Sequence, residues 1–218
     1  MGCSRAGSFV PMDRWQPAGE ADDTNSSATA ELLVDAMASY DRGDYAAALA
    51  VLVPLAEQGN ARAQGLVGVM YGLGQGVPVD YGLAWDWLCR GAEAGDTNAE
   101  YNFGTLYEKG LGTLRMPKEA LYWFRRAAAK HASAAQFNIA AYYEEGRAVP
   151  QDFTLAYMWY HLAATGTDDA EVQARAVKER RLMAAKLTKA EISRARRMAR
   201  KWLTEHPKDG GASVPAIC

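Results

Sequence analysis

The chain has 218 residues, of which 49% are hydrophobic and 23% charged, a composition typical of a globular protein with a sizeable core. Its net charge of −2 conceals a division, because residues 1–174 carry a net charge of −10 and residues 175–201 a net charge of +9. No apolar run reaches the about 18 residues that a membrane-spanning helix needs, and Cys3, Cys89 and Cys218 are too isolated to form a disulfide framework.

The N-terminal segment, residues 1–30, is rich in Gly, Ser, Asp, Asn and Pro, which predicts disorder. It lacks the hydrophobic stretch of a signal peptide, so the sequence as given favours a cytoplasmic location. Ala28-Thr29-Ala30 nevertheless resembles an export cleavage site. A periplasmic or secreted location is therefore the alternative, if the N-terminus is truncated or misassigned.

From residue 61 onward, one pattern recurs three times at a spacing of 36 residues. The first half of each copy places four small or aromatic residues in register: Ala63, Gly68, Tyr71, Gly74; Ala99, Gly104, Tyr107, Gly110; Ala135, Ala140, Tyr143, Gly146. The second half repeats three more: Ala84, Trp87, Ala92; Ala120, Trp123, Ala128; Ala156, Trp159, Ala164. All but one of these aligned positions carry the same residue in every copy. A period between about 20 and 50 residues indicates a repeat array, in which each unit buries its apolar face against its neighbours.

Each copy is predicted to be a pair of helices, because the apolar residues of both halves fall on one stripe of a helix. The two predicted helices are joined by a glycine turn, and glycine past a helix end supplies a left-handed residue. Asp80 and Asp152 stand where the second helix needs an N-cap. The middle copy has no such Asp in residues 113–116 and instead begins with Pro117. The three tryptophans are expected in equivalent, mostly buried sites.

These residues resemble the Sel1-like repeat family, a branch of the tetratricopeptide-like helical repeats, over roughly residues 35 to 168. The resemblance implies an all-α fold, a right-handed α-solenoid of antiparallel helix pairs over residues 31–168. It divides this solenoid into a degenerate unit, 31–60, with a predicted first helix from Asp35 to Arg42, and three full units, 61–96, 97–132 and 133–168.

Residues 169–206 are predicted to form C-terminal capping helices, the first from Ala170 to Lys186. Thr188 and Glu191 then form a capping box that opens the last helix, which ends near Glu205. One stripe of this helix is predicted to cover the third repeat: Ile192, Ala195, Met198, Ala199, Trp202. Residues 207–218 are predicted to be a disordered tail. The basic residues of this region suggest an acidic partner or self-association with the acidic repeats, unless they are only a solvated face.

Motifs for catalysis are missing from the sequence, which has neither Ser-x-x-Lys nor Gly-x-Ser-x-Gly. The glycine run of residues 72–76 follows a predicted helix and recurs in the repeats, so it is interpreted as a turn and not a phosphate loop. His131, His161 and His206 are interpreted as solvated or capping residues, and no metal or other cofactor is predicted. Among the arginines of the last helix only Trp202 is aromatic, which argues against a nucleic-acid partner.

The resemblance therefore implies a non-enzymatic scaffold that binds a protein or peptide on the concave surface lined by the first helix of each pair. Tyr101 and Phe137 are the candidate anchors, with packing between repeats as the equal alternative, and Asn102 and Asn138 could hold a partner's main chain. The candidate partner-binding residues are Asn98, Tyr101, Asn102, Thr105, Glu108, Phe137, Asn138 and Glu144. A β-lactamase-like hydrolase and a component of envelope assembly or maintenance are the alternative functions.

Overall fold

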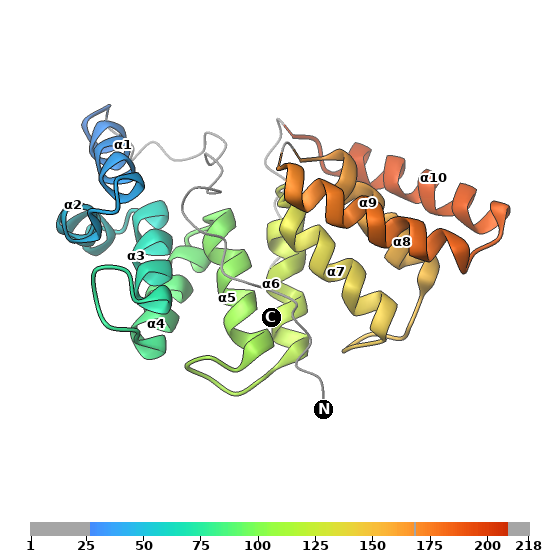
Figure 1. Ribbon diagram of the computed structural model, residues 1–218, viewed down its shortest axis with the longest axis horizontal. Coiled ribbons are helices and arrows are strands. Elements are labelled where there is room, and N and C mark those ends of the chain that lie inside the picture. Colours follow the sequence, from blue (N-terminus) through green and yellow to red (C-terminus); the bar gives the residue numbers. More distant parts are fainter. Residues whose placement is uncertain (1–26, 168, 209–218) are drawn as a thin grey trace. The chain divides into compact units, whose positions relative to one another are not determined.

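The computed structural model describes residues 27–167 and 169–208, and in that part of the chain it contains ten α-helices and no β-strand (Figure 1). The helices are α1 Ser27–Asp41, α2 Tyr45–Glu57, α3 Ala61–Leu73, α4 Tyr81–Glu93, α5 Thr97–Lys109, α6 Pro117–Ala129, α7 Ser133–Glu145, α8 Phe153–Thr165, α9 Ala170–Ala185 and α10 Lys189–Glu205. The predicted all-α class is confirmed.

The helices belong to two compact units, α1–α5 and α6–α10. In the first unit consecutive helices pack against one another, and α3 also contacts α5. In the second unit α7 contacts α6, α8 and α9, while α8 also contacts α9 and α10. Consecutive packing of helix pairs confirms the predicted α-solenoid architecture, and its right-handedness stays a prediction. The largest fully buried side chains line these contacts: Leu52, Leu66, Met70, Leu88, Phe103, Leu106, Phe124, Ile139, Tyr142, Tyr160, Leu162.

A left-handed glycine ends the first helix of each full repeat, as predicted. Gly74, Gly110 and Gly146 have φ values of 71°, 70° and 69°. Their backbone N–H groups donate to the carbonyls four residues earlier, in the last turns of α3, α5 and α7, so each helix ends in the same way. Glycine suits this position because a Cβ atom strains the left-handed conformation.

The loop before each second helix closes with one recurring backbone hydrogen bond. The N–H groups of residues Asp80, Met116 and Asp152 donate to the carbonyls of Tyr71, Tyr107 and Tyr143, at N···O distances of 3.0, 2.9 and 3.0 Å. Asp80 and Asp152 also cap α4 and α8 with their carboxylates, as predicted. Met116 has no carboxylate, yet α6 still begins at Pro117. The backbone bond and not the acidic cap is therefore what the three loops share.

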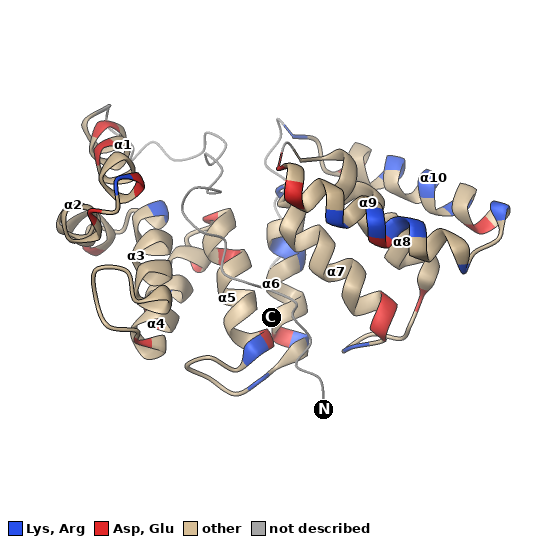
Figure 2. Cartoon of the chain, viewed as in Figure 1, with Lys and Arg blue, Asp and Glu red and all other residues tan. Residues whose placement is uncertain are grey.

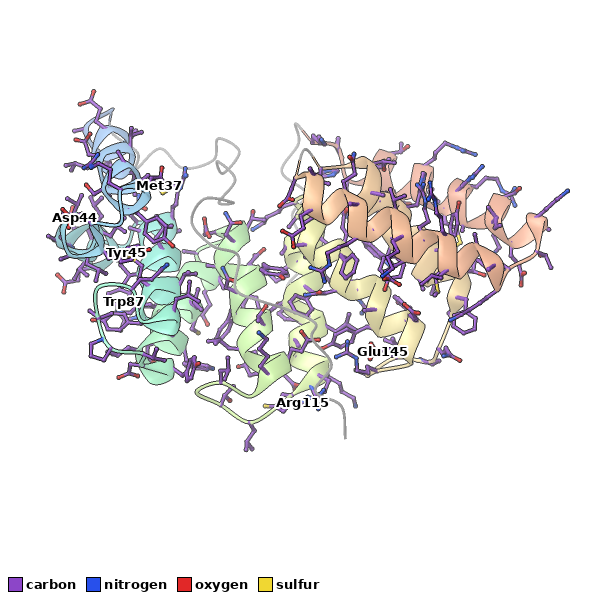
Figure 3. The ribbon with its side chains drawn as sticks, viewed as in Figure 1. Met37, Asp44, Tyr45, Trp87, Arg115 and Glu145 are labelled. Carbon is purple, nitrogen blue, oxygen red and sulfur yellow. The ribbon has the colours of Figure 1, made fainter. Side chains whose placement is uncertain are left out.

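The N-terminal helix pair begins earlier than the sequence predicted. Helix α1 starts at Ser27, so residues 27–30, predicted to be disordered, are helical, as the two alanines among them favour. Asp44, next to Tyr45 (Figure 3), caps α2. The ring of Tyr45 contacts that of Tyr40 at 5.0 Å between centroids. Residues 1–26, the rest of the predicted disordered segment, lie outside the described residues, as do residues 209–218 of the predicted tail.

The C-terminal helices lie against the third repeat. Thr188 and Glu191 form the predicted capping box at the start of α10. On the predicted stripe of α10 the two alanines are buried and Ile192, Met198 and Trp202 are half-buried. The Trp202 ring meets that of Trp159 edge-on at 5.4 Å between centroids. This contact places the stripe on α8, as a cap requires.

The three repeat tryptophans are not equally buried, which corrects the prediction. Trp159 is 9% exposed, whereas Trp87 and Trp123 are half-buried. The guanidinium of the arginine three residues later covers each of these two rings, Arg90 at 4.9 Å and Arg126 at 4.8 Å from the ring centroid. In the third copy α10 covers the ring instead, which explains its deeper burial.

Candidate interaction surface

The predicted partner-binding residues of α5 are mostly buried. Asn98 is half-buried, but Tyr101 is 6% exposed, Glu108 4%, and Asn102 and Thr105 0%. The Thr105 hydroxyl donates to the Tyr101 carbonyl at 3.1 Å, within the helix. The expected outward orientation of Thr105 and Glu108 is therefore wrong, and the burial of Tyr101 favours packing between repeats over a free anchor. A helix inside the array is contacted from several sides, as α3 is by α2, α4 and α5, so the face opposite the packing stripe is not automatically free.

Phe137 on α7 is half-buried, and its ring packs against neighbouring side chains. Its ring lies edge-on to that of Tyr160 at 5.1 Å between centroids, and the Arg175 guanidinium sits 4.8 Å from its centroid. It packs against a buried cluster of three alanines from α8 and α9, Ala163, Ala164 and Ala176. The structure thus favours the packing alternative over a free anchor, because α9 occupies the side of α7 that the sequence left open.

The amides predicted to hold a partner's main chain are buried as well. Asn138 is 3% exposed, and its Nδ2 atom has no hydrogen-bond partner among the described residues. Asn102 lies on α5 at the equivalent repeat position and is 0% exposed. Because both side chains are enclosed, a bound peptide could reach them only after a rearrangement of the helices around them. Their burial argues against contact with a partner's main chain in this arrangement, and that role stays a prediction.

Glu144, the last of the predicted residues, joins three helices. The Tyr160 hydroxyl of α8 donates to its Oε2 atom at 2.8 Å, and Lys186 Nζ, just past α9, lies 3.7 Å from Oε1. Burial, and then the hydrogen bond to Glu144, raise the pKa of the Tyr160 hydroxyl, which keeps its proton. Half-buried Glu144 is thus part of an internal network rather than an open contact point.

Besides the exposed last residue of each first helix, Leu73, Lys109 and Glu145, two repeat positions of these helices remain partly accessible in all three copies. One precedes the buried alanine of the stripe and holds Arg62, Asn98 and Ala134, and all three residues are half-buried. The other holds the repeat tyrosine near the helix end, at Tyr71, Tyr107 and Tyr143, likewise half-buried. Burial lowers the pKa of Arg62, and the charge of Asp96 counteracts this shift. The first of these positions differs in chemistry from copy to copy, whereas the tyrosine does not.

The exposed surface of the two C-terminal helices is basic. Figure 2 shows Lys and Arg along α9 and α10. Most of these side chains are exposed: Arg175, Lys178, Arg181, Lys189, Arg194, Arg196, Arg197, Arg200 and Lys201. Lys201 pairs with Glu205 at 3.5 Å along α10, a solvated pair of small energetic value.

Beneath this surface, arginines from both C-terminal helices contact polar side chains of α8. Arg180 Nη1 lies 3.0 Å from His161 Nδ1, and Arg196 Nε donates to the Tyr157 hydroxyl at 3.3 Å. A guanidinium only donates, so His161 Nδ1 must accept and the ring must be neutral. Burial, then the charges of Arg180, Arg196 and Arg200, lower the pKa of His161, in agreement with that geometry.

Sequence reasoning interpreted His161 as solvated or capping and missed this cluster. The sequence feature that pointed to this region was the positive net charge of residues 175–201, which correctly located the basic segment. Which arginines face α8 depends on how α9 and α10 pack against it, and no local pattern encodes that register.

Groups suited to covalent or metal chemistry are few in the described residues. No group of three or more His, Cys, Asp or Glu side chains there could hold a metal ion. Burial, followed by the nearby Glu93, raises the pKa of the Cys89 thiol to about 11, so this thiol is protonated at neutral pH. Over the same residues, no helix has the length and hydropathy needed to span a bilayer.

Comparisons with known proteins agree with the repeat geometry. The Sel1 repeat family matches residues 61–96, 97–131 and 133–168. A Sel1 repeat protein from Oxalobacter formigenes is 29% identical, with a TM-score of 0.63 and coverage of 69% of this chain and 58% of that one. The protein c5321, a protective antigen of uropathogenic Escherichia coli strains with an SLR fold, is 24% identical, with a TM-score of 0.72 and coverage of 87% and 44%. This chain thus covers about half the length of these structures. No curated protein matches it.

Proposed function

Because this chain is a Sel1-like repeat protein, we propose that it is a non-enzymatic scaffold that binds a protein or peptide partner. Sel1 repeat proteins generally serve as protein-interaction scaffolds, and their fold is typically non-catalytic. Identity of the partner is a property of individual surface residues rather than of the fold.

One observation carries the proposal for this chain. The glycine caps and the loop hydrogen bonds recur in all three copies, while the accessible position before the stripe alanine changes from Arg62 to Asn98 to Ala134. A constant frame that presents different side chains at regular intervals suits recognition of an extended polypeptide. We therefore assign partner contact to the first-helix strip, defined here as Arg62 on α3 and Asn98 on α5.

The test begins with the full chain immobilised as bait in a lysate of the source organism, followed by a binding titration with the purified candidate partner. Replacing both Arg62 and Asn98 with alanine should weaken binding about tenfold, as the loss of a few polar contacts at an interface commonly does. Asp86→Ala, at an exposed position of α4, is the control and should leave the affinity unchanged.

Two results would count against the scaffold proposal. One is a partner whose affinity is the same for the double variant and for the control. The other is turnover of a chromogenic β-lactam above the buffer rate, which would favour the hydrolase alternative.

A further inference from the structure

Arg180 of α9 and Arg196 of α10 each contact a polar side chain of α8, and Arg200 lies one helical turn beyond Arg196. We propose that Arg180, Arg196 and Arg200 form a binding site for the carboxylates of an acidic partner segment. We call this set the arginine cluster. It lies in the second unit and does not include the first-helix strip, so it is a second recognition surface and does not depend on the first.

Two members of the cluster are held in place by neutral acceptors. His161 Nδ1 accepts from Arg180 at 3.0 Å, and the hydroxyl of Tyr157, a residue that is 3% exposed, accepts from Arg196 at 3.3 Å. Each guanidinium uses one N–H group in this way and retains the others. Fixed guanidinium groups lose less conformational entropy on binding than free ones, which favours recognition of a planar anion.

The cluster lacks an internal counter-charge. None of its three arginines forms an ion pair with an Asp or Glu of residues 27–167 or 169–208. Arg196 and Arg200 are spaced i, i+4 on α10, where like charges disfavour the folded helix. An anion placed between them would relieve this repulsion and gain charge-assisted hydrogen bonds. His161 adds no positive charge near neutral pH, because its ring is neutral in this geometry.

The neighbouring residues favour a protein carboxylate over a nucleic acid. A single strand needs aromatic faces on which its bases can stack. Trp202, the aromatic residue nearest in sequence to the cluster on α10, already contacts Trp159 at 5.4 Å, His131 at 5.4 Å and His206 at 4.4 Å between centroids. Its ring is thus occupied and offers no free face to a base. A short segment with Asp or Glu residues matches the three guanidinium groups of the cluster.

A short fluorescein-labelled Glu-rich peptide is the probe, and its affinity for the full chain is measured by fluorescence anisotropy at low salt. Replacing both Arg196 and Arg200 with glutamine should raise Kd about tenfold or more, because two charge-assisted contacts are lost. The matched control is Arg194→Gln with Arg197→Gln, which removes the same charge from the same helix outside the cluster. Its Kd should change by less than about threefold, as expected for long-range charge alone.

Two further measurements separate a loss of binding from a loss of folding and test the role of the guanidinium shape. Circular dichroism and the melting temperature of each variant show whether α10 remains folded. Arg196→Lys with Arg200→Lys keeps the charge but loses the planar fork, and an intermediate Kd would support carboxylate recognition.

The proposal is overturned if wild type does not bind the peptide or if both glutamine pairs weaken binding equally. Tighter, cluster-dependent binding of a single-stranded oligonucleotide than of the peptide would also overturn it. So would cluster-dependent dimerisation in sedimentation velocity, which would identify a second copy of the chain as the occupant.

Discussion

At the scale of single residues, one loop position shows how backbone geometry limits the choice of side chain. Gly76, Gly112 and Ala148 are 36 residues apart and have φ values of 75°, 69° and 57°. The first two loops need glycine for space as well as for φ, because a Cβ atom at Gly112 would collide with the Tyr81 carbonyl and one at Gly76 would lie 2.8 Å from Tyr45 Cβ. Ala148 therefore occupies a left-handed position at a cost that glycine avoids.

Ala148→Gly should stabilise the protein slightly. Relief of left-handed strain gains about 1 kcal/mol, and the greater freedom of glycine in the unfolded chain removes about half of that gain. The comparison is Gly112→Ala, which should lower the free energy of unfolding by about 2 kcal/mol or more, because backbone must move to admit the methyl group. Urea titrations monitored by circular dichroism measure both. Destabilisation by Ala148→Gly would show that the strain is negligible.

The half-buried histidines should make stability depend on pH. Burial is the first cause that lowers the pKa of both His131 and His161 below the ordinary 6.5, and Arg180, Arg196 and Arg200 act on His161 in the same direction. In the unfolded chain both rings take up protons first as pH falls, so their contribution to stability is complete above about pH 6.5 and is lost progressively below it.

Melting temperatures measured from about pH 7 to about pH 5 should therefore fall for wild type. They should fall less steeply for His131→Gln with His161→Gln, because glutamine does not titrate and can still accept from Arg180. An identical pH slope in the two proteins would mean that other groups control the acid sensitivity.

At the scale of helices, contacts between α8 and α10 replace what a further repeat would supply. Trp159 is more buried than Trp87 or Trp123, because the ring of Trp202 covers it. His131 Nε2 donates to the His206 carbonyl at 2.7 Å, which also ties the end of α10 to the turn after α6. The cap is thus held by aromatic packing at one point and by a hydrogen bond at another.

Trp202→Ala should lower the free energy of unfolding by about 2–4 kcal/mol, since a large aromatic side chain is lost from a partly buried site. Leu203→Ala is the matched control on the same turn. That leucine is 42% exposed, and its loss should cost about 0.5 kcal/mol or less. Equal effects of the two substitutions in denaturant titrations would indicate that α10 does not act as a cap.

The sequence predicted the helix pairs because their determinants are local. Glycine at a left-handed φ, a capping box and a stripe of apolar residues each act within a few residues of their own helix. The exposure of Tyr101 and Phe137 was not predictable in this way, since it depends on which other helices lie beside α5 and α7. The same non-local register brings Arg180 to His161, so the arginine cluster was visible only as a basic segment.

At the scale of the whole chain, opposite charges are separated along the sequence. The net charge of residues 1–174 is −10 and that of residues 175–201 is +9, and the described basic side chains are mostly exposed on α9 and α10. Arg115, a basic residue outside the C-terminal helices, lies in the loop after α5 (Figure 3). Its Nε atom donates to the Glu108 carbonyl at 3.0 Å, so this N–H group is already used within the loop. Among the described residues, the exposed Lys and Arg side chains are therefore concentrated on the C-terminal helices.

Deletion of residues 188–218 tests the cap and the charge division together. The deleted segment has a net charge of +4, so the truncated chain carries −6 instead of −2 and should repel its copies more strongly. It also loses Trp202 and the other apolar residues of α10 that lie on α8. Charge repulsion between exposed groups is screened beyond about 8 Å at physiological salt, whereas attraction between apolar patches is not. We therefore expect the apolar effect to dominate at that salt concentration.

Sedimentation velocity at increasing salt should then show the truncated chain associating more as repulsion is screened, while the full chain does not change in this way. The melting temperature of the truncated chain should fall by several degrees, because about 2–4 kcal/mol of packing is lost with Trp202 alone and a domain of this size loses roughly 2–4 °C per kcal/mol. The contrary result is a truncated chain that stays monomeric at every salt concentration and has the same melting temperature as the full chain. That result would show that α10 neither shields the apolar surface of α8 from solvent nor stabilises the fold.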